Sequence, residues 1–289
     1  MRVLIVGGDG LLGHAMVRGL RAAHKLAVTL HGPREAYRDF ALLQGDRVAH
    51  GLDVRDEAAL RKAIDWAAPQ AIINCAGLVK RDGAGNPAAE IEINALFPHR
   101  LAQASRDAGA KLIHFSTDCV FSGRKGGYTE DDPPDEPGLH GRCKALGEVQ
   151  APHCLVLRTS VIGRELSCKR SLVEWYLAQR GVIRGYRRAI YSGFTTRELA
   201  RIVDLLLLRQ PDMHGTWHVA SAPISKFDLL SGLHRRLDRT DARVEPWDGF
   251  VCDRSLDGTR FGEATGYRAP IWDRMLDELA ADVGAGAGA

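Results

Sequence analysis

The fold is decided by residues 2–13, which read Arg2-Val3-Leu4-Ile5-Val6-Gly7-Gly8-Asp9-Gly10-Leu11-Leu12-Gly13. The first five residues form a compact apolar run, which is typical of a central strand in a parallel sheet. A helical pattern over about residues 11–24 follows the glycines. Strand, glycine turn and helix in this order are the context that a dinucleotide-binding motif needs. The N-terminus therefore predicts a cofactor site.

Each glycine of that turn has its own expected task. Gly7 makes the tight turn, Gly10 lets a pyrophosphate approach the backbone, and Gly13 lets the helix pack on the strand. Leu11 and Leu12, which lie between the last two glycines, are assigned to the same site. A glycine triplet alone is weak evidence, but its place between a strand and a helix favours cofactor binding over a plain turn.

Further strands and helices alternate along the chain. Apolar runs at 26–30, 71–73 and 154–160 indicate buried strands, and a helical pattern covers 57–67. The small residues Cys75, Ala76 and Gly77 follow the 71–73 strand and would let the backbone approach a cofactor; the alternative is an ordinary strand-ending turn. This alternation predicts an α/β fold with a Rossmann-type doubly wound parallel sheet.

The end of the second strand bears on the choice between NAD and NADP. Proteins that select NAD usually place an acid here for the ribose 2′-hydroxyl. This chain offers His31 and Arg34, with no carboxylate before Glu35. An arginine accommodates a 2′-phosphate, so NADP(H) is preferred over NAD(H). A solvated loop arginine is an almost equally good interpretation of Arg34.

A second decisive stretch begins after the apolar run at 111–115. It reads Ser116-Thr117-Asp118-Cys119-Val120-Phe121-Ser122-Gly123 and continues, beyond a loop, as His140-Gly141-Arg142-Cys143-Lys144. A strand that ends in Ser-Thr-Asp places hydroxyl groups at the carboxyl edge of the sheet, where open α/β proteins bind ligands. On a helix, His140 and Lys144 share one face because they are four residues apart.

These two stretches resemble the extended short-chain dehydrogenase/reductases, and most closely their dTDP-4-dehydrorhamnose reductase-like, sugar-nucleotide branch. The resemblance covers the chain to about residue 280. It implies that Thr117 orients a carbonyl group and that Lys144 binds the nicotinamide ribose and tunes the proton donor. Where the family has a catalytic tyrosine, this chain has His140. The resemblance also assigns Asp53 and Val54 to the adenine.

The same resemblance implies how the chain is divided. Residues 1–160, with returning segments at about 189–220, would form the dinucleotide-binding domain. Residues 161–188 and 221–280 would form a smaller, discontinuous C-terminal substrate lobe, and 281–289 a disordered tail. The residues assigned to the substrate are Ser116, Asp118, Val120, Trp175, Arg187 and Arg254. A core position in the lobe is an equally good interpretation of Trp175.

Three interpretations of His140 stay open. Imidazole can serve as a general acid at neutral pH, although the nearby Lys144 would disfavour its charged form. Alternatively, the pocket binds its ligands without turnover, as in the regulatory subunit of methionine adenosyltransferase, which resembles these reductases. In the third, His140 is an ordinary helix residue, and Tyr128 or water supplies the proton.

The favoured function is NAD(P)-dependent reduction of a nucleotide-activated 4-keto-6-deoxy sugar by Thr117, His140 and Lys144. The alternatives are a catalytically impaired regulatory protein that binds cofactor and nucleotide sugar, or a nucleotide-sugar epimerase or dehydratase. A nucleotide sugar is the expected partner, and a homodimer is a candidate assembly.

Composition excludes several other classes. The 289 residues are 45% hydrophobic and 26% charged, as in an ordinary globular protein. The net charge of +3 comes from scattered residues, which disfavours a nucleic-acid partner. No apolar run reaches the length of a membrane span. The six cysteines form no Cys-x-x-Cys pair, so we expect free thiols, no metal site and a cytoplasmic location.

Overall fold

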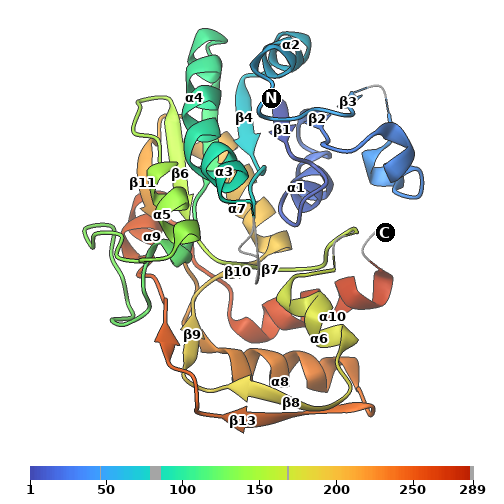
Figure 1. The fold of residues 1–289 in the computed structure, drawn as a ribbon, viewed down its shortest axis with the longest axis vertical. Helices are drawn as coiled ribbons and strands as arrows, with labels where there is room; N and C mark the ends of the chain where they lie inside the picture. Colours follow the sequence, from blue (N-terminus) through green and yellow to red (C-terminus); the bar gives the residue numbers. More distant parts are fainter. Residues whose placement is uncertain (46, 79–85, 168, 287–289) are drawn as a thin grey trace.

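The computed structural model describes residues 1–45, 47–78, 86–167 and 169–286. Its main feature is a seven-stranded sheet in the order β11-β6-β5-β4-β1-β2-β3, in which all neighbouring strands run parallel (Figure 1). The strands are β1 (Arg2–Val6), β2 (Lys25–Thr29), β3 (Val48–Ala49), β4 (Ala71–Asn74), β5 (Lys111–Phe115), β6 (Cys154–Arg158) and β11 (Gly215–His218). The predicted Rossmann-type doubly wound sheet is confirmed.

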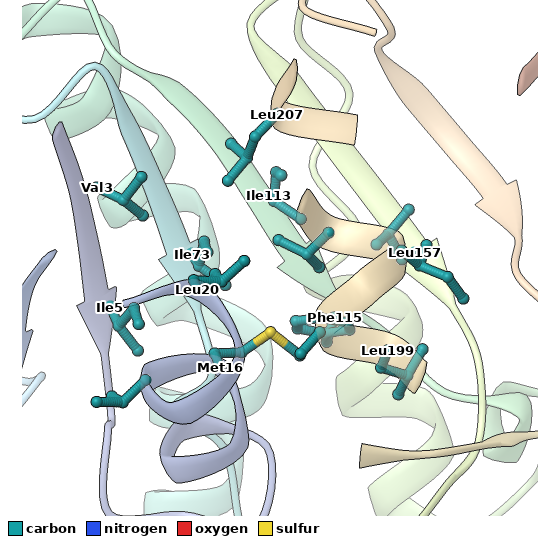
Figure 2. Close-up of a cluster of buried hydrophobic side chains, with 14 of the residues drawn as sticks. Val3, Ile5, Met16, Leu20, Ile73, Ile113, Phe115, Leu157, Leu199 and Leu207 are labelled. Carbon is teal, nitrogen blue, oxygen red and sulfur yellow. The ribbon is translucent and has the colours of Figure 1, made fainter. Parts of the chain in front are cut away.

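Helices cover both faces of this sheet. On one face lie α1 (Gly13–Leu20) and α7 (Thr196–Arg209), and on the other lie α2 (Glu57–Ala67) and α4 (Phe97–Asp107). Strand β1 shows why both faces need cover. Val3 and Ile5 belong to the apolar cluster with α1 and α7 (Figure 2). Leu4 and Val6 belong to the cluster with α2 and α4. Successive side chains of a strand point to opposite faces, so an unbroken apolar run fits only a strand buried on both sides.

Burial on this scale is the main contribution to stability. Val3, Leu4, Ile5 and Val6 are all fully buried. Each such side chain contributes about 1.5–3 kcal/mol relative to an exposed one. The strands of the core are therefore fixed firmly, and the loops at their carboxyl ends have a rigid base.

Side-chain caps begin several helices. Asp56 accepts a hydrogen bond from the Ala59 amide at the start of α2, and Thr195 accepts one from the Glu198 amide at the start of α7. Ser225, predicted as a cap, accepts one from the Asp228 amide and begins α8 (Lys226–Leu237). Such caps satisfy amide groups that have no partner within the helix.

The C-terminal lobe lies at the carboxyl edge of the sheet, in the lower half of Figure 1. Its apolar cluster contains side chains from α6 (Leu172–Ala178), α8, α10 (Trp272–Ala285), β8 (Gly181–Tyr186) and β13 (Ala242–Trp247). Strands β8 and β13 pair in parallel although they come from two separate parts of the chain. The lobe is thus discontinuous in sequence.

Short strands complete the lobe and its junction with the sheet. They form two small sheets from β7 (Val161–Ile162), β9 (Ala189–Tyr191), β10 (Phe194–Thr195), β12 (Ile224–Ser225) and β14 (Cys252–Asp253), followed by α9 (Thr259–Thr265). Of the predicted returning segments, α7 and β11 join the main domain. Strand β9 instead pairs with β12 and β14.

Two predicted boundaries need correction. Helix α1 begins at Gly13 rather than near 11, because the residues before it complete the glycine turn. Helix α10 continues to Ala285, so a disordered tail from 281 is wrong for residues 281–285; Met275, Leu276 and Leu279 anchor this helix by burial. Residues 287–289 of the predicted tail lie outside the described residues.

Shorter elements surround the carboxyl edge of the sheet. They are η1 (Arg34–Tyr37), η2 (Ala41–Leu43), α3 (Pro87–Glu90), the π-helix η3 (Ile91–Leu96), η4 (Asp118–Val120) and α5 (Leu139–Leu146). Within the described ranges, none of the helices combines the length and apolar character needed to cross a membrane.

Candidate active site

A pocket of about 880 Å³ opens where β1, β2, β4 and β5 end. Each strand contributes a residue at or just beyond its carboxyl end: Gly7, His31, Cys75 and Thr117. Strands β1 and β4 are neighbours, and the chain order of the sheet reverses between them. Ligands of open α/β sheets bind at such a reversal. The pocket therefore lies where the sheet topology predicts a ligand.

The glycine turn combines two packing requirements with one open position. A Cβ atom on Gly13 would lie 2.0 Å from the Gly7 carbonyl oxygen, and one on Gly7 would lie 2.8 Å from the Ala76 amide nitrogen. A Cβ on Gly10 would meet no protein atom closer than 3.6 Å. The protein itself thus excludes side chains at Gly7 and Gly13, whereas glycine at Gly10 leaves room in the pocket. That opening fits the pyrophosphate of a dinucleotide.

The loop after β2 is fastened to the glycine turn. The Tyr37 hydroxyl donates to Asp9 at 2.6 Å and accepts from the Gly32 amide at 2.8 Å. His31 lines the pocket, as does Asp9, which the sequence interpretation missed. Arg34 begins η1 and is exposed; it is not among the described residues that line the pocket.

Asp53 and Val54 both line the pocket, but Asp53 already has a partner. Arg55 binds its two carboxylate oxygens at 2.6–3.1 Å, and these hydrogen bonds lower the pKa of Asp53 to about 2. The predicted adenine acceptor is therefore a charged, paired carboxylate.

The segment after β4 also reaches the pocket. Cys75, Ala76 and Gly77 line it, and burial raises the pKa of the Cys75 thiol well above its ordinary value. Asn94, on η3, holds Leu78, the residue that follows Gly77. The side-chain oxygen of Asn94 accepts from the Leu78 amide at 3.0 Å, and its side-chain nitrogen donates to the Leu78 carbonyl oxygen at 2.9 Å. A helix asparagine thus fixes this strand end.

Thr117 is the hydroxyl that β5 delivers to the pocket. Its Oγ1 accepts from the Cys119 amide at 3.1 Å and donates to the Asp118 carboxylate at 3.2 Å. Asp118 is buried, which raises its pKa, although Lys226 and Arg254 oppose that shift. Asp118 does not line the pocket within the described residues; it holds Thr117 from behind.

His140 lies near the start of α5, and it faces a carboxylate that the sequence interpretation missed. Its Nδ1 lies 2.9 Å from Oε1 of Glu90, the last residue of α3. Both residues line the pocket, and their side chains are 13% and 20% exposed. A signal for Glu90 existed: it precedes Asn94 by four residues, so a helix places both on one face.

Lys144 lies one turn beyond His140, below the pocket. Its Nζ donates to the Phe115 carbonyl oxygen at 2.7 Å. Burial lowers the pKa of Lys144 to about 8, although Glu148 opposes that shift. Lys144 is not among the described residues that line the pocket, so in this structure its ammonium group supports the end of β5.

Behind β5 and β6 lies a buried charge cluster made of Glu148, Arg158 and His218. Arg158 binds both carboxylate oxygens of Glu148, at 2.8 and 2.7 Å, and lies 3.2 Å from Nε2 of His218. The Ser116 hydroxyl donates to Glu148 at 2.6 Å. Ser116, predicted to contact substrate, is thus held by this cluster and does not line the pocket within the described residues.

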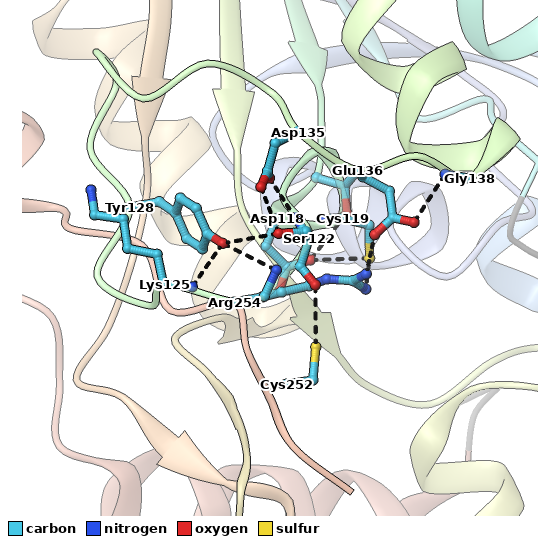
Figure 3. A network of polar contacts seen from close by, with 12 residues as sticks. Asp118, Cys119, Ser122, Lys125, Tyr128, Asp135, Glu136, Gly138, Cys252 and Arg254 are labelled. Carbon is cyan, nitrogen blue, oxygen red and sulfur yellow. Dashed lines mark hydrogen bonds and ion pairs between the residues drawn. The ribbon is translucent and has the colours of Figure 1, made fainter.

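Tyr128 does not reach the pocket as a proton donor. It is buried and stacks on Phe121 with ring centroids 4.2 Å apart. Its hydroxyl accepts from the Gly123 amide at 3.1 Å and from the Lys125 amide at 3.2 Å (Figure 3). The hydroxyl therefore closes a loop, and Tyr128 is absent from the described pocket lining.

Arg254 brings a cation from the lobe into the pocket. It donates to Glu136 at 2.5 Å and to the Cys119 sulfur at 3.4 Å (Figure 3). Its buried Nε has no hydrogen-bond partner among the described residues. Buried donors are nearly always satisfied, so this atom indicates an acceptor from a ligand, since the described residues supply none.

Three residues assigned to the substrate lie elsewhere. Trp175, on α6, is 42% exposed and Arg187 pairs with Asp248 on the outer surface of the lobe. Val120 is fully buried against Phe121 and Leu256, not beside Thr117 in the pocket. The predicted residues that do line the pocket are Gly7, Gly10, His31, Asp53, Val54, Cys75, Ala76, Gly77, Thr117, His140 and Arg254. Leu11, Leu12 and Gly13 lie outside the described lining, in the turn and at the start of α1.

Comparisons with known proteins agree with this geometry. A relative from Streptomyces antibioticus, named probable dTDP-4,6-dihydroxy-2-methyloxan-3-one 4-ketoreductase, is 32% identical over 98% of this chain and 97% of its own. Methionine adenosyltransferase 2 subunit beta of Rattus norvegicus is 31% identical over 51% of this chain and 41% of its own.

A crystal structure of dTDP-4-dehydrorhamnose reductase from Bacillus anthracis, in complex with NADP, shares the fold. Its TM-score is 0.80 at 22% identity, over 97% of this chain and 99% of the other. The model of the family described as RmlD substrate binding domain matches residues 1–250. The chain therefore belongs to the RmlD substrate binding domain family.

Proposed function

We propose that the protein uses NADPH to reduce a nucleotide-activated 4-keto-6-deoxy sugar. The observation that carries the proposal is the shared pocket. The open glycine turn, the Thr117 hydroxyl, the His140 imidazole and the Arg254 guanidinium all line it. A dinucleotide site that adjoins a hydroxyl, a proton donor and a cation for phosphate has the parts that ketone reduction of a nucleotide sugar requires.

NADP is the favoured cofactor. The described residues at the end of β2 offer His31 rather than a carboxylate, and the Bacillus anthracis relative was solved with NADP. A ribose 2′-hydroxyl is normally held by an acid at this position. We expect a higher kcat/KM with NADPH than with NADH, and the reverse order would contradict the cofactor assignment.

The chain's own residues then have separate tasks. Thr117, held by Asp118, orients the keto oxygen. When bound, the reduced nicotinamide supplies a hydride to the carbonyl carbon. His140 donates the proton that the new alkoxide takes up, and it later regains a proton from water. Lys144 supports the end of β5 through the Phe115 carbonyl and places a positive charge below the site.

The substrate class rests on the lobe and on the relatives. The unpaired Nε of Arg254 suits a phosphate oxygen of the nucleotide. The Streptomyces antibioticus relative is named for a 4-keto group on a dTDP-linked sugar, which favours the same class here. The homodimer and the cytoplasmic location expected from the sequence stay predictions.

A regulatory protein is the second candidate, because the rat relative is the beta subunit of another enzyme. One experiment separates the two. NADPH absorbance is followed with a panel of dTDP- and UDP-linked 4-keto-6-deoxy sugars, for the protein as it is and for His140→Tyr. Turnover by the unaltered protein, with no gain in the variant, supports the reductase with His140 as its acid.

The other outcomes contradict the proposal in different ways. Turnover by the variant alone would mean a reductase pocket without its own chemistry, which supports the regulatory candidate. No turnover by either protein would overturn the substrate class. Interconversion of sugars without net consumption of NADPH would indicate an epimerase or dehydratase instead.

A further inference from the structure

Glu90 and His140 form the one close carboxylate–imidazole contact that lines the pocket within the described residues. A carboxylate can only accept, so Nδ1 of the ring carries the hydrogen that joins the two at 2.9 Å. This contact fixes which ring nitrogen faces Glu90. The other nitrogen, Nε2, is then the atom from which His140 can release a proton.

The backbone around Glu90 is built to hold it there. Asn86 caps α3 by accepting from the Ala89 amide, and Pro87 occupies the first turn. The π-helix η3 begins directly after Glu90, and its Asn94 is fixed by two hydrogen bonds to Leu78. Single π-turns often occur at functional sites. Glu90 is therefore positioned from both sides along the chain.

Within the described ranges, the other carboxylates on the elements around α5 have partners of their own. On the elements packed against α5, Glu92 pairs with Arg55, and Asp118 holds Thr117. Glu136, beside Gly141, pairs with Arg254. On α5 itself, Arg142 and Lys144 both oppose a charged imidazole, and the Cys143 thiol adds no charge because burial raises its pKa. Among the residues that the structure describes, Glu90 is thus the carboxylate paired with His140, where it offsets the charge of Lys144.

We propose that Glu90 is a positioning residue which, paired with His140, makes the imidazole a proton donor in place of the family's tyrosine. The inference rests on the proposed function. In the reaction, the hydride forms a C–H bond, the carbonyl π electrons become an alkoxide, and the Nε2 proton joins that oxygen. The imidazolium becomes neutral imidazole, while the Glu90 carboxylate keeps its charge throughout.

The test uses Glu90→Gln, which keeps size and removes charge. The matched control is Glu92→Gln, which alters a carboxylate two residues away that lies outside the described pocket lining. We expect Glu90→Gln to lower kcat about tenfold or more at neutral pH, since general acid catalysis is worth at least that much. NADPH affinity, followed by fluorescence, should stay the same in both variants.

The pH profile separates positioning from a structural role. Loss of the negative charge should move the fall in rate at high pH downward by about one pH unit, because an adjacent opposite charge favours the imidazolium. The same substitution in the His140→Tyr background should have no such effect. A profile for Glu90→Gln that matches the unaltered protein would overturn the proposal.

A readout without turnover keeps this inference separate from the proposed function. The His140 ring can be titrated by NMR, with its signals assigned by their absence in His140→Asn. If no sugar is reduced, but Glu90→Gln still lowers the pH at which the ring deprotonates, the pairing stands and the substrate is wrong. If the ring titrates identically in both proteins, the pairing itself is refuted.

Discussion

The glycine turn and the buried charge cluster depend on different interactions. The turn is built from backbone, and Gly7 and Gly13 are required because a Cβ would collide with other backbone atoms. The cluster is built from side chains, with Arg158 of β6 bound to Glu148 and close to His218 of β11. The turn excludes atoms, whereas the cluster neutralises charge. Substitutions in the two regions should therefore affect stability and binding differently.

The largest expected effect is in the charge cluster. Arg158→Met would leave the Glu148 carboxylate buried without its cation. Breaking a buried ion pair from one side costs about 3–5 kcal/mol, so denaturant unfolding should show a loss of that order. Replacing both partners, as Arg158→Met with Glu148→Leu, should recover most of the stability. If Arg158→Met alone were as stable as the unaltered protein, the ion pair would contribute little to the free energy of unfolding.

The glycine turn should separate stability from binding. Gly13→Ala places a Cβ against the Gly7 carbonyl and should cost about 3 kcal/mol of unfolding free energy. Gly10→Ala meets no close protein atom, so its stability should change by less than about 1 kcal/mol. Gly10→Ala should nevertheless weaken NADPH binding. Equal stability losses at the two positions would contradict the distinct roles described for them.

A pH titration should next separate Lys144, which interacts electrostatically with Glu148 of the charge cluster, from the glycine turn. Burial holds the pKa of Lys144 near 8, whereas an unfolded lysine titrates at about 10.4. Between these values the unfolded chain binds more protons, so stability should rise with pH, by about 3 kcal/mol in all. Lys144→Met should lack this rise. Gly10→Ala, which alters no titrating group, should follow the unaltered protein; a rise that persists in Lys144→Met would have another source.

The smallest effect is expected on the outside of the lobe. Arg187 and Asp248 form an exposed pair, and solvent screening makes the contribution of such pairs to stability small. Arg187→Ala should leave both unfolding and sugar reduction nearly unchanged. A tenfold fall in kcat/KM for the sugar would restore the role that sequence position alone had assigned to this arginine.

Site residues that depend on local spacing could be predicted from the sequence, whereas those that depend on distant contacts could not. The sequence predicts Gly7 and Gly13 because close backbone contacts at fixed spacing exclude a side chain there. It predicts Gly10 because a pyrophosphate must approach the backbone at that position. His140 follows from the family resemblance, because it occupies the position of the catalytic tyrosine, four residues before Lys144. Glu90 was missed because its partner is fifty residues away, and helical spacing alone does not say which helices touch.

In the C-terminal lobe, even fewer of the contacts could be predicted from sequence spacing. Trp175 and Arg187 were assigned to substrate from the segment that contains them, and neither reaches the pocket lining in the described part of the chain. Arg254 reaches it because β14 pairs with β9, a contact that periodicity cannot reveal. A long, buried strand restricts its own sequence, whereas a short strand in a small sheet depends on distant neighbours.

The parallel pairing of β8 with β13 also has a consequence for synthesis of the chain. Strand β8 emerges from the ribosome before α7, β11 and α8, and its partner β13 follows all three. Until then β8 presents unpaired backbone groups, a template for contacts with other chains. Truncation before β13 would make that exposure permanent. We therefore expect shortened chains to aggregate even though their nucleotide-binding sheet is complete.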